Sequence, residues 1–168
     1  NPDAPYDGGD TDCDGRNDYD GDGDTDIFVC NDVAENFLFK NEGDGTLKEV
    51  GLASGVAYNS AGDANASRGV SCGDFDNDGL LDFFVTTYQD ENPVLYRNRG
   101  LGLFDDVTLT AKAATNLYVE VNWGTGLVDF DFDGDRDLFV ANGHTEDNIN
   151  LRSENASYKS PNALLINE

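Results

Sequence analysis

The sequence has few of the residues on which most catalytic and nucleic-acid-binding sites depend. It contains one His, one Trp, no Met and only ten Lys and Arg among 168 residues. The single His144 gives no support to a Ser-His-Asp or Cys-His system, and a structural role in a turn fits it better. So few cations also offer little to stabilise an anionic transition state. The formal net charge of −24 excludes nucleic-acid binding as the default function, because phosphate would repel this chain.

Long apolar runs and a leader segment are absent too. No run approaches the roughly 18 apolar residues that a membrane helix needs, so the sequence predicts no membrane span. Without a starting Met or a charged-then-apolar leader, we expect a processed or excised chain. The three cysteines cannot all pair within one chain. Cys30 and Cys72 fall in strand-like segments, which favours buried thiols over a bridge, and Cys13 would be the odd thiol of a secreted protein.

Aspartate, by contrast, is abundant and concentrated. The chain has 26 Asp against 8 Glu, and 17 of the Asp lie within residues 10–26, 74–82 and 129–137. These 17 side chains account for most of the net charge of −24. The clustered aspartates therefore indicate local binding sites rather than a generally acidic, solvated surface.

Two signatures recur in the same order along the chain. The pattern D-x-D-x-D-G-x-x-D leads each time into an apolar segment, at residues 18–26, 74–82 and 129–137, with starts 56 and 55 residues apart. An L-x-x-N signature follows each one, at residues 38–41, 95–98 and 164–167. Gly/Asn turns and β-branched and aromatic residues predict three or four short strands per unit. In the second unit we expect strands at about 68–73, 82–88, 94–98 and 103–107.

These repeats predict an all-β fold, a partial β-propeller of about three four-stranded blades with calcium-binding β-hairpin loops. The blades would cover about residues 18–66, 67–115 and 116–168, after an acidic Gly/Asp-rich arm at 1–17. The first blade lacks a convincing inner strand, and the third stops before its outer strand. Closed propellers use about four to eight blades, so we expect a piece of a longer chain or a subunit that completes its sheets with a neighbour. Only residues 111–116 look mildly helical.

The acidic stretches have the chemistry of calcium loops. Alternate Asp residues on a tight loop converge on one point, the Gly at position six supplies the sharp turn, and Ca²⁺ accepts six to eight oxygens. We predict that the carboxylates of positions one, three, five and nine bind the ion with the backbone carbonyl of position seven. The predicted ligands, in the order of positions one, three, five, seven and nine, are Asp18, Asp20, Asp22, Asp24 and Asp26; Asp74, Asp76, Asp78, Leu80 and Asp82; and Asp129, Asp131, Asp133, Asp135 and Asp137.

Other interpretations of the acidic loops fit the sequence less well. An EF-hand fails because position twelve is Val29, Val85 or Val140 rather than Glu, inside strand-like sequence. Magnesium suits an all-protein carboxylate wrap less well, and zinc would need His or Cys ligands. Acidic β-turns without metal remain an alternative, although four carboxylates in one turn would repel each other. A fourth, overlapping match at Asp10, Asp12 and Asp14, sharing Asp18, is either a fourth calcium site or an acidic arm.

The repeats resemble a known family. Asp74-Phe-Asp-Asn-Asp-Gly79, Leu95-Tyr-Arg-Asn98 and the segment from Trp123 to His144 are similar to FG-GAP/VCBS repeats, and most like the cartilage acidic protein and ASPIC/UnbV group, in which an Asn-Gly-His typically follows the calcium hairpin. Integrin α-subunit propellers carry similar repeats. The resemblance covers about residues 18–168. It implies an extracellular propeller that holds calcium in the hairpin between a blade's first and second strands.

From this we expect an extracellular, secreted or cell-surface calcium-binding propeller segment that acts in adhesion, protein interaction or self-assembly, and is not an enzyme. Its partners would be further copies, the rest of a longer chain, or an extracellular protein or glycan. A carbohydrate-binding or polysaccharide-lyase propeller is the alternative, although Trp123 suits blade packing better than a sugar platform. Arg97 and Arg99 are expected at a solvated strand end.

Overall fold

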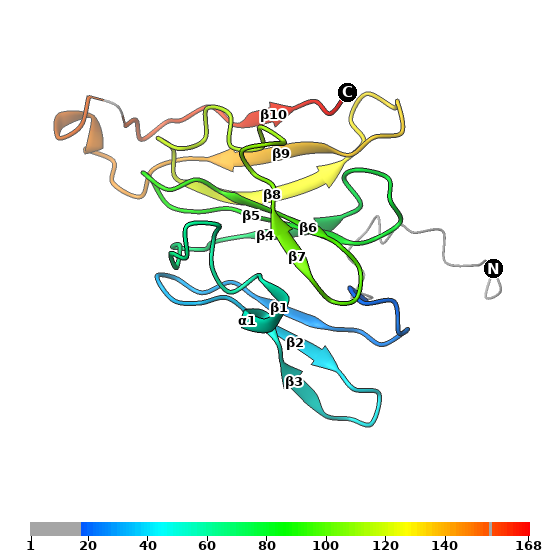
Figure 1. The fold of residues 1–168 in the computed structure, drawn as a ribbon. Helices are drawn as coiled ribbons and strands as arrows, with labels where there is room; N and C mark the ends of the chain where they lie inside the picture. The colour runs from blue at the N-terminus through cyan, green and yellow to red at the C-terminus, as the bar shows by residue number, and fades with distance from the viewer. Residues whose placement is uncertain (1–17, 155) are drawn as a thin grey trace.

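The computed structural model describes residues 18–154 and 156–168 and is all-β. Three small antiparallel sheets are stacked one on the next (Figure 1). Sheet one has strands β1 (Ile27–Val29), β2 (Phe37–Asn41) and β3 (Leu47–Glu49); sheet two has β4 (Val70–Gly73), β5 (Asp82–Val85), β6 (Val94–Asn98) and β7 (Phe104–Asp106); sheet three has β8 (Asn122–Val128), β9 (Asp137–Asn142) and β10 (Ala163–Leu165). In each sheet, strands that follow one another in sequence are hydrogen-bonded neighbours.

The sheets follow the sequence repeat. Strands β1, β5 and β9 come directly after the three acidic stretches, and β2, β6 and β10 carry the L-x-x-N signature. Sheet two contains all four predicted strands of its unit, each within a few residues of the expected bounds. Within the described residues, sheet one has no counterpart of β4 and sheet three has none of β7. This is consistent with a propeller-like fold, while the exact bounds of the units stay predictions.

Sheet two is the centre of the molecule because both its faces are buried. Successive side chains of a strand point to opposite faces, so β5 sends Phe83 and Val85 to one side and Phe84 to the other. Phe83 and Val85 join a core cluster with Leu38 of sheet one, whereas Phe84 joins a second cluster with Leu138 of sheet three. Sheet one therefore packs on one face of sheet two and sheet three on the other (Figure 1).

Two local elements differ from expectation. The prediction of helix at 111–116 was wrong, because residues 108–119 form consecutive turns, which bury Ala113 and Leu117 against the second cluster. The sequence pattern gave no sign of α1 (Gly51–Ser54), a single helical turn after β3. Gly51 lies so close to β2 that a Cβ there would approach the Asn36 carbonyl oxygen to 2.9 Å, so only Gly fits.

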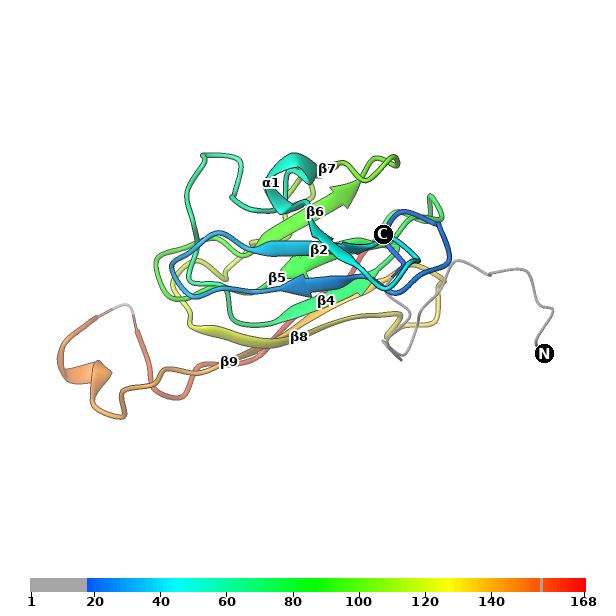
Figure 2. The same cartoon turned by 90° about the horizontal axis from the view of Figure 1, so that it is seen from below.

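The connection from β9 to β10 extends away from the sheets in both views and includes the short 3-10 helix η1 (Ile149–Leu151) (Figures 1 and 2). Most of its side chains are exposed or half-buried. Across the described parts of the chain, no helix has the length and apolarity that crossing a membrane would need.

Candidate metal centre

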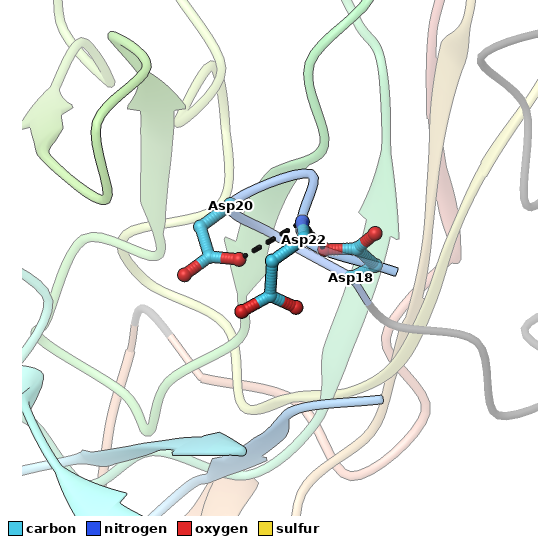
Figure 3. A group of neighbouring side chains, drawn as sticks. All are labelled: Asp18, Asp20 and Asp22. Carbon is cyan, nitrogen blue, oxygen red and sulfur yellow. Dashed lines mark hydrogen bonds between the residues drawn. The ribbon is translucent and has the colours of Figure 1, made fainter. Parts of the chain in front are cut away.

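The three acidic stretches form three similar loops, named here loop one (18–26), loop two (74–82) and loop three (129–137). Each leads into the second strand of a repeat unit, β1, β5 or β9, so all three lie at the same end of the stacked sheets, at the right of Figure 1. In each loop, three carboxylates offer oxygen atoms within 4.8 Å of one another. The three groups are Asp18, Asp20 and Asp22; Asp74, Asp76 and Asp78; and Asp129, Asp131 and Asp137. Figure 3 shows the first of them.

The Asp at position one shapes each loop from within. Its carboxylate accepts a hydrogen bond from the backbone N–H of the Gly at position six, at 2.7 Å from Gly23, 2.8 Å from Gly79 and 3.1 Å from Gly134. These glycines have φ angles of 92°, 85° and 103°, a left-handed backbone that disfavours any other residue. The position-five carboxylate likewise accepts from the N–H of position seven in all three loops. The three loops thus share one internal geometry.

The Asp at position nine is buried and fastens the loop to the neighbouring strand. Asp26, Asp82 and Asp137 are 3%, 0% and 0% exposed. One carboxylate oxygen of each accepts from the backbone N–H of loop position two, at 3.2, 3.0 and 2.8 Å. The other oxygen accepts from the backbone N–H of the Asn that ends L-x-x-N, at 2.8, 2.7 and 2.9 Å. The two recurring signatures are therefore two halves of one hydrogen-bonded unit.

The Asn side chain of that unit reaches back to the previous loop. Asn98 donates from Nδ2 to the backbone carbonyl of Tyr19 in loop one, at 2.8 Å. Asn167 donates in the same way to the carbonyl of Phe75 in loop two, also at 2.8 Å. Tyr19 and Phe75 occupy position two of their loops. Loops one and two are thereby each held in place by the unit that follows.

Burial raises the free-energy cost of ionising carboxylates in these loops. It raises the pKa of the Asp26 carboxyl to about 6 and that of Asp82 to about 7, with a smaller contribution from the negative charges of neighbouring loop aspartates. Burial and the nearby Asp78 charge also raise the pKa of Asp76. These carboxylates resist ionisation in one another's company, so a bound cation would offset their repulsion.

Two basic side chains contact the loops, and the sequence pattern did not predict these contacts. Lys40 of β2 forms ion pairs with Asp20 and Asp22. Arg97 of β6 forms the corresponding pairs in loop two; its side chain is 38% exposed near the strand end, as expected, but it also contacts the loop carboxylates. The available signal was the third residue of L-x-x-N, which is basic in the first two repeats and Ile166 in the third.

The structure brings most of the predicted ligands together. Positions one, three and five cluster in loops one and two, and positions one, three and nine in loop three. Asp26 and Asp82 lie outside these clusters and bind backbone N–H groups, as does Asp133, which accepts from Asp135. Their role as metal ligands stays a prediction, as does that of the position-seven carbonyls. Asp10, Asp12 and Asp14 lie outside the described residues.

Other residues noted in the sequence have structural roles. His144, 8% exposed, accepts from the Glu146 backbone N–H at Nδ1 and contacts Gln89 at Nε2, which fits its predicted place in a turn. Trp123 donates to the Gly143 carbonyl, and the Arg68 guanidinium lies over its ring. Cys72 is buried in the cluster between sheets one and two, as expected, whereas Cys30 packs against that cluster but is only half-buried. Cys13 lies outside the described part of the chain.

Comparison with known proteins agrees with this geometry. A model of the FG-GAP-like repeat matches residues 18–85 and 74–140. Cartilage acidic protein 1 of Xenopus tropicalis is 29% identical over 120 residues, which cover 69% of this chain but only 17% of that protein. The chain thus spans less than a fifth of this curated relative. Since the repeat model covers most of the chain and coincides with the acidic loops and their strands, the protein belongs to the FG-GAP-like repeat family.

Proposed function

We propose that the three loops bind Ca²⁺ and that the chain is an extracellular FG-GAP-type unit that serves protein interaction rather than catalysis. The observation that carries the proposal is that a cluster of three carboxylates recurs in three loops, each with the same hydrogen bond from the Gly at position six to the Asp at position one. The donor set fits the ion, because it consists of hard oxygen atoms with no nitrogen or sulfur. Extracellular calcium is millimolar, which keeps even weak loops of this kind filled.

Calcium would act here chiefly as a structural ion. When bound, it would supply the positive charge that the clustered carboxylates of each loop lack. An ion that binds only the folded chain adds about 2.7 kcal/mol per site when its concentration is 100 times its Kd. The loops fasten neighbouring strands through position nine, so the stability of the loops and that of the sheets are linked.

Thermal unfolding with and without calcium tests this proposal. Removing calcium with EDTA should lower the Tm by well over about 10 °C, because about 1 kcal/mol corresponds to 2–4 °C in a chain of this size. Excess Mg²⁺ is the control and should restore much less of the Tm than Ca²⁺, since it dehydrates reluctantly and demands octahedral geometry. An unchanged Tm in EDTA would overturn the structural role of calcium.

The sheet faces that point outward support a role in self-assembly. In sheet one, Phe28 and Leu38 pack toward sheet two, so their neighbours Ile27, Phe37 and Phe39 point to the opposite face. Ile27 is 44% exposed there, although its repeat counterpart in sheet two, Phe83, is 3% exposed. At the other end of the stack, sheet three likewise presents exposed Leu164.

The outer faces of sheets one and three correspond, in the repeat, to the two faces of sheet two. Both faces of sheet two are packed against a neighbouring sheet inside the molecule. Sheet two meets sheet one through Phe83 and Val85, whose counterparts Ile27 and Val29 lie on the outer face of sheet one. It meets sheet three through Phe84 and Leu95, the second of which corresponds to the exposed Leu164. We therefore propose that sheet three of one copy packs on sheet one of another, head to tail.

Sedimentation at several protein concentrations tests this contact. The wild-type chain should form particles that grow with concentration, and Ile27→Lys should shift them toward monomer, because a buried ammonium would disfavour the packed face. Leu52→Lys is the matched control: Leu52 is 72% exposed on α1 and should leave association unchanged. A strictly monomeric wild-type chain at every concentration would contradict head-to-tail association.

A further inference from the structure

The three loops differ at one neighbouring residue, the third position of L-x-x-N, although they share the hydrogen bonds at positions one and five. This position is Lys40 beside loop one, Arg97 beside loop two and Ile166 beside loop three. We infer that Lys40 and Arg97 compete with calcium for loops one and two, and that loop three binds calcium at the lowest concentration. The inference rests on the proposed calcium function and deepens it by ordering the sites.

The contacts show what the basic side chains would compete for. Lys40 Nζ lies 2.8 Å from a carboxylate oxygen of Asp22 and also pairs with Asp20. Arg97 Nη2 lies 2.6 Å from Asp76 and 3.3 Å from Asp78. In both loops these are the carboxylates of positions three and five, two of the three that form the oxygen cluster. An oxygen that accepts from a cationic group has less electron density to offer an ion, and the two positive charges repel each other.

Loop three has no such competitor among the described residues. Ile166 is 45% exposed and carries no charge. Arg136, at position eight of loop three, lines an apolar cavity with Phe75 and Leu138 between sheets two and three, and forms no ion pair with a described carboxylate. The neighbouring contact from loop two is a neutral amide, since Asn77 donates to Asp135 at 2.5 Å. The acidic charge of loop three is therefore left for an external cation.

The expected difference in calcium affinity between the loops is moderate. Lys40 and Arg97 are partly exposed, and water screens such ion pairs. Exposed ion pairs are weak, so each basic side chain should weaken calcium binding to its loop by roughly three- to tenfold relative to loop three, which equals about 0.6–1.4 kcal/mol. In exchange, the basic side chains offset part of the carboxylate repulsion in loops one and two when calcium is scarce.

A calcium titration followed by amide NMR separates the three loops. Each has its own reporter, the backbone N–H of Gly23, Gly79 or Gly134, because that group lies inside the loop and donates to position one. The Gly134 signal should shift at the lowest calcium concentration. Arg97→Ile should lower the midpoint for Gly79, and Lys40→Ile that for Gly23, by roughly three- to tenfold. Neither variant should move the other two loops by a comparable amount.

The reverse variant and a charge control complete the design. Ile166→Lys should raise the midpoint for Gly134 toward those of the other loops. Lys159→Ile removes the same charge as Lys40→Ile from an exposed site in the β9–β10 connection, and should leave all three midpoints unchanged. If Lys40→Ile does not fold, the Arg97→Ile and Ile166→Lys pair carries the test.

The outcomes of this titration separate the inference from the proposed function. Equal midpoints in the three loops of the wild-type chain, or midpoints that the substitutions at 97 and 166 leave unchanged, would overturn the inference while calcium binding itself stands. If none of the three glycine signals responds to calcium, the proposed function fails and the inference fails with it.

Discussion

Equivalent residues of the repeat have very different surroundings in sheet two and in the sheets beside it. Leu95 of sheet two is 4% exposed, whereas Leu164, the same position of L-x-x-N in sheet three, is 49% exposed. Phe83 and its counterpart Ile27 in sheet one differ similarly, at 3% and 44%. The repeat pattern thus determines where a strand begins and which face a side chain joins, while burial depends on whether another sheet lies against that face.

The largest effect that tests this comparison is expected from truncating the two leucines. Leu95→Ala should lower the free energy of unfolding by about 2–5 kcal/mol, because it removes buried apolar volume between two sheets. Leu164→Ala should cost less than about 1 kcal/mol at its half-exposed site. Urea unfolding of the dilute, calcium-loaded chain measures both. Equal losses would mean that the outer face of sheet three is covered in solution.

A smaller difference in the free energy of unfolding is expected between substitutions at Asn98 and at Asn41. These residues end L-x-x-N in the second and first repeats. Asn98 is fully buried, and its side chain donates to the carbonyls of Leu81 and Tyr19. Asn98→Ala should lower the free energy of unfolding by about 2–3 kcal/mol, because two carbonyls lose their donor. Asn41 is half-buried and donates within its own unit to Thr25, so Asn41→Ala should cost about 1 kcal/mol. Urea midpoints compared at equal m-values report both losses. A larger loss for Asn41→Ala would argue against a stabilising hydrogen bond from Asn98 to loop one.

Much of the fold could be predicted from the sequence because the repeat supplied three copies of the same signal. Gly/Asn turns with β-branched and aromatic residues between them placed the strands, and the acidic pattern placed the loops with their left-handed glycines at position six. The pattern also identified the carboxylates that cluster at positions one and three. It could not show that Asp26 and Asp82 each accept from two backbone N–H groups, since one donor of each pair, Asn41 or Asn98, comes from a later strand.

The remaining surprises concern residues whose role depends on the packing of neighbouring strands. Lys40 and Arg97 look like ordinary strand-end cations until β2 and β6 are placed beside their loops. The turn α1 begins at Gly51, whose close approach to β2 depends on tertiary packing and is not visible in local propensity. Residues 111–116 have helix-forming composition, but their apolar side chains are held in consecutive turns by the second core cluster.

The amide contacts from Asn98 to loop one and from Asn167 to loop two both run from a later unit to an earlier one. These side-chain hydrogen bonds between units therefore run in one direction along the stack. Deleting sheet three would remove one donor and leave the Asn98 contact intact, whereas deleting loop one would leave a buried amide of sheet two without one of its two acceptors. Shortened versions of the molecule should therefore tolerate trimming from the carboxyl-terminal side better than from the amino-terminal side.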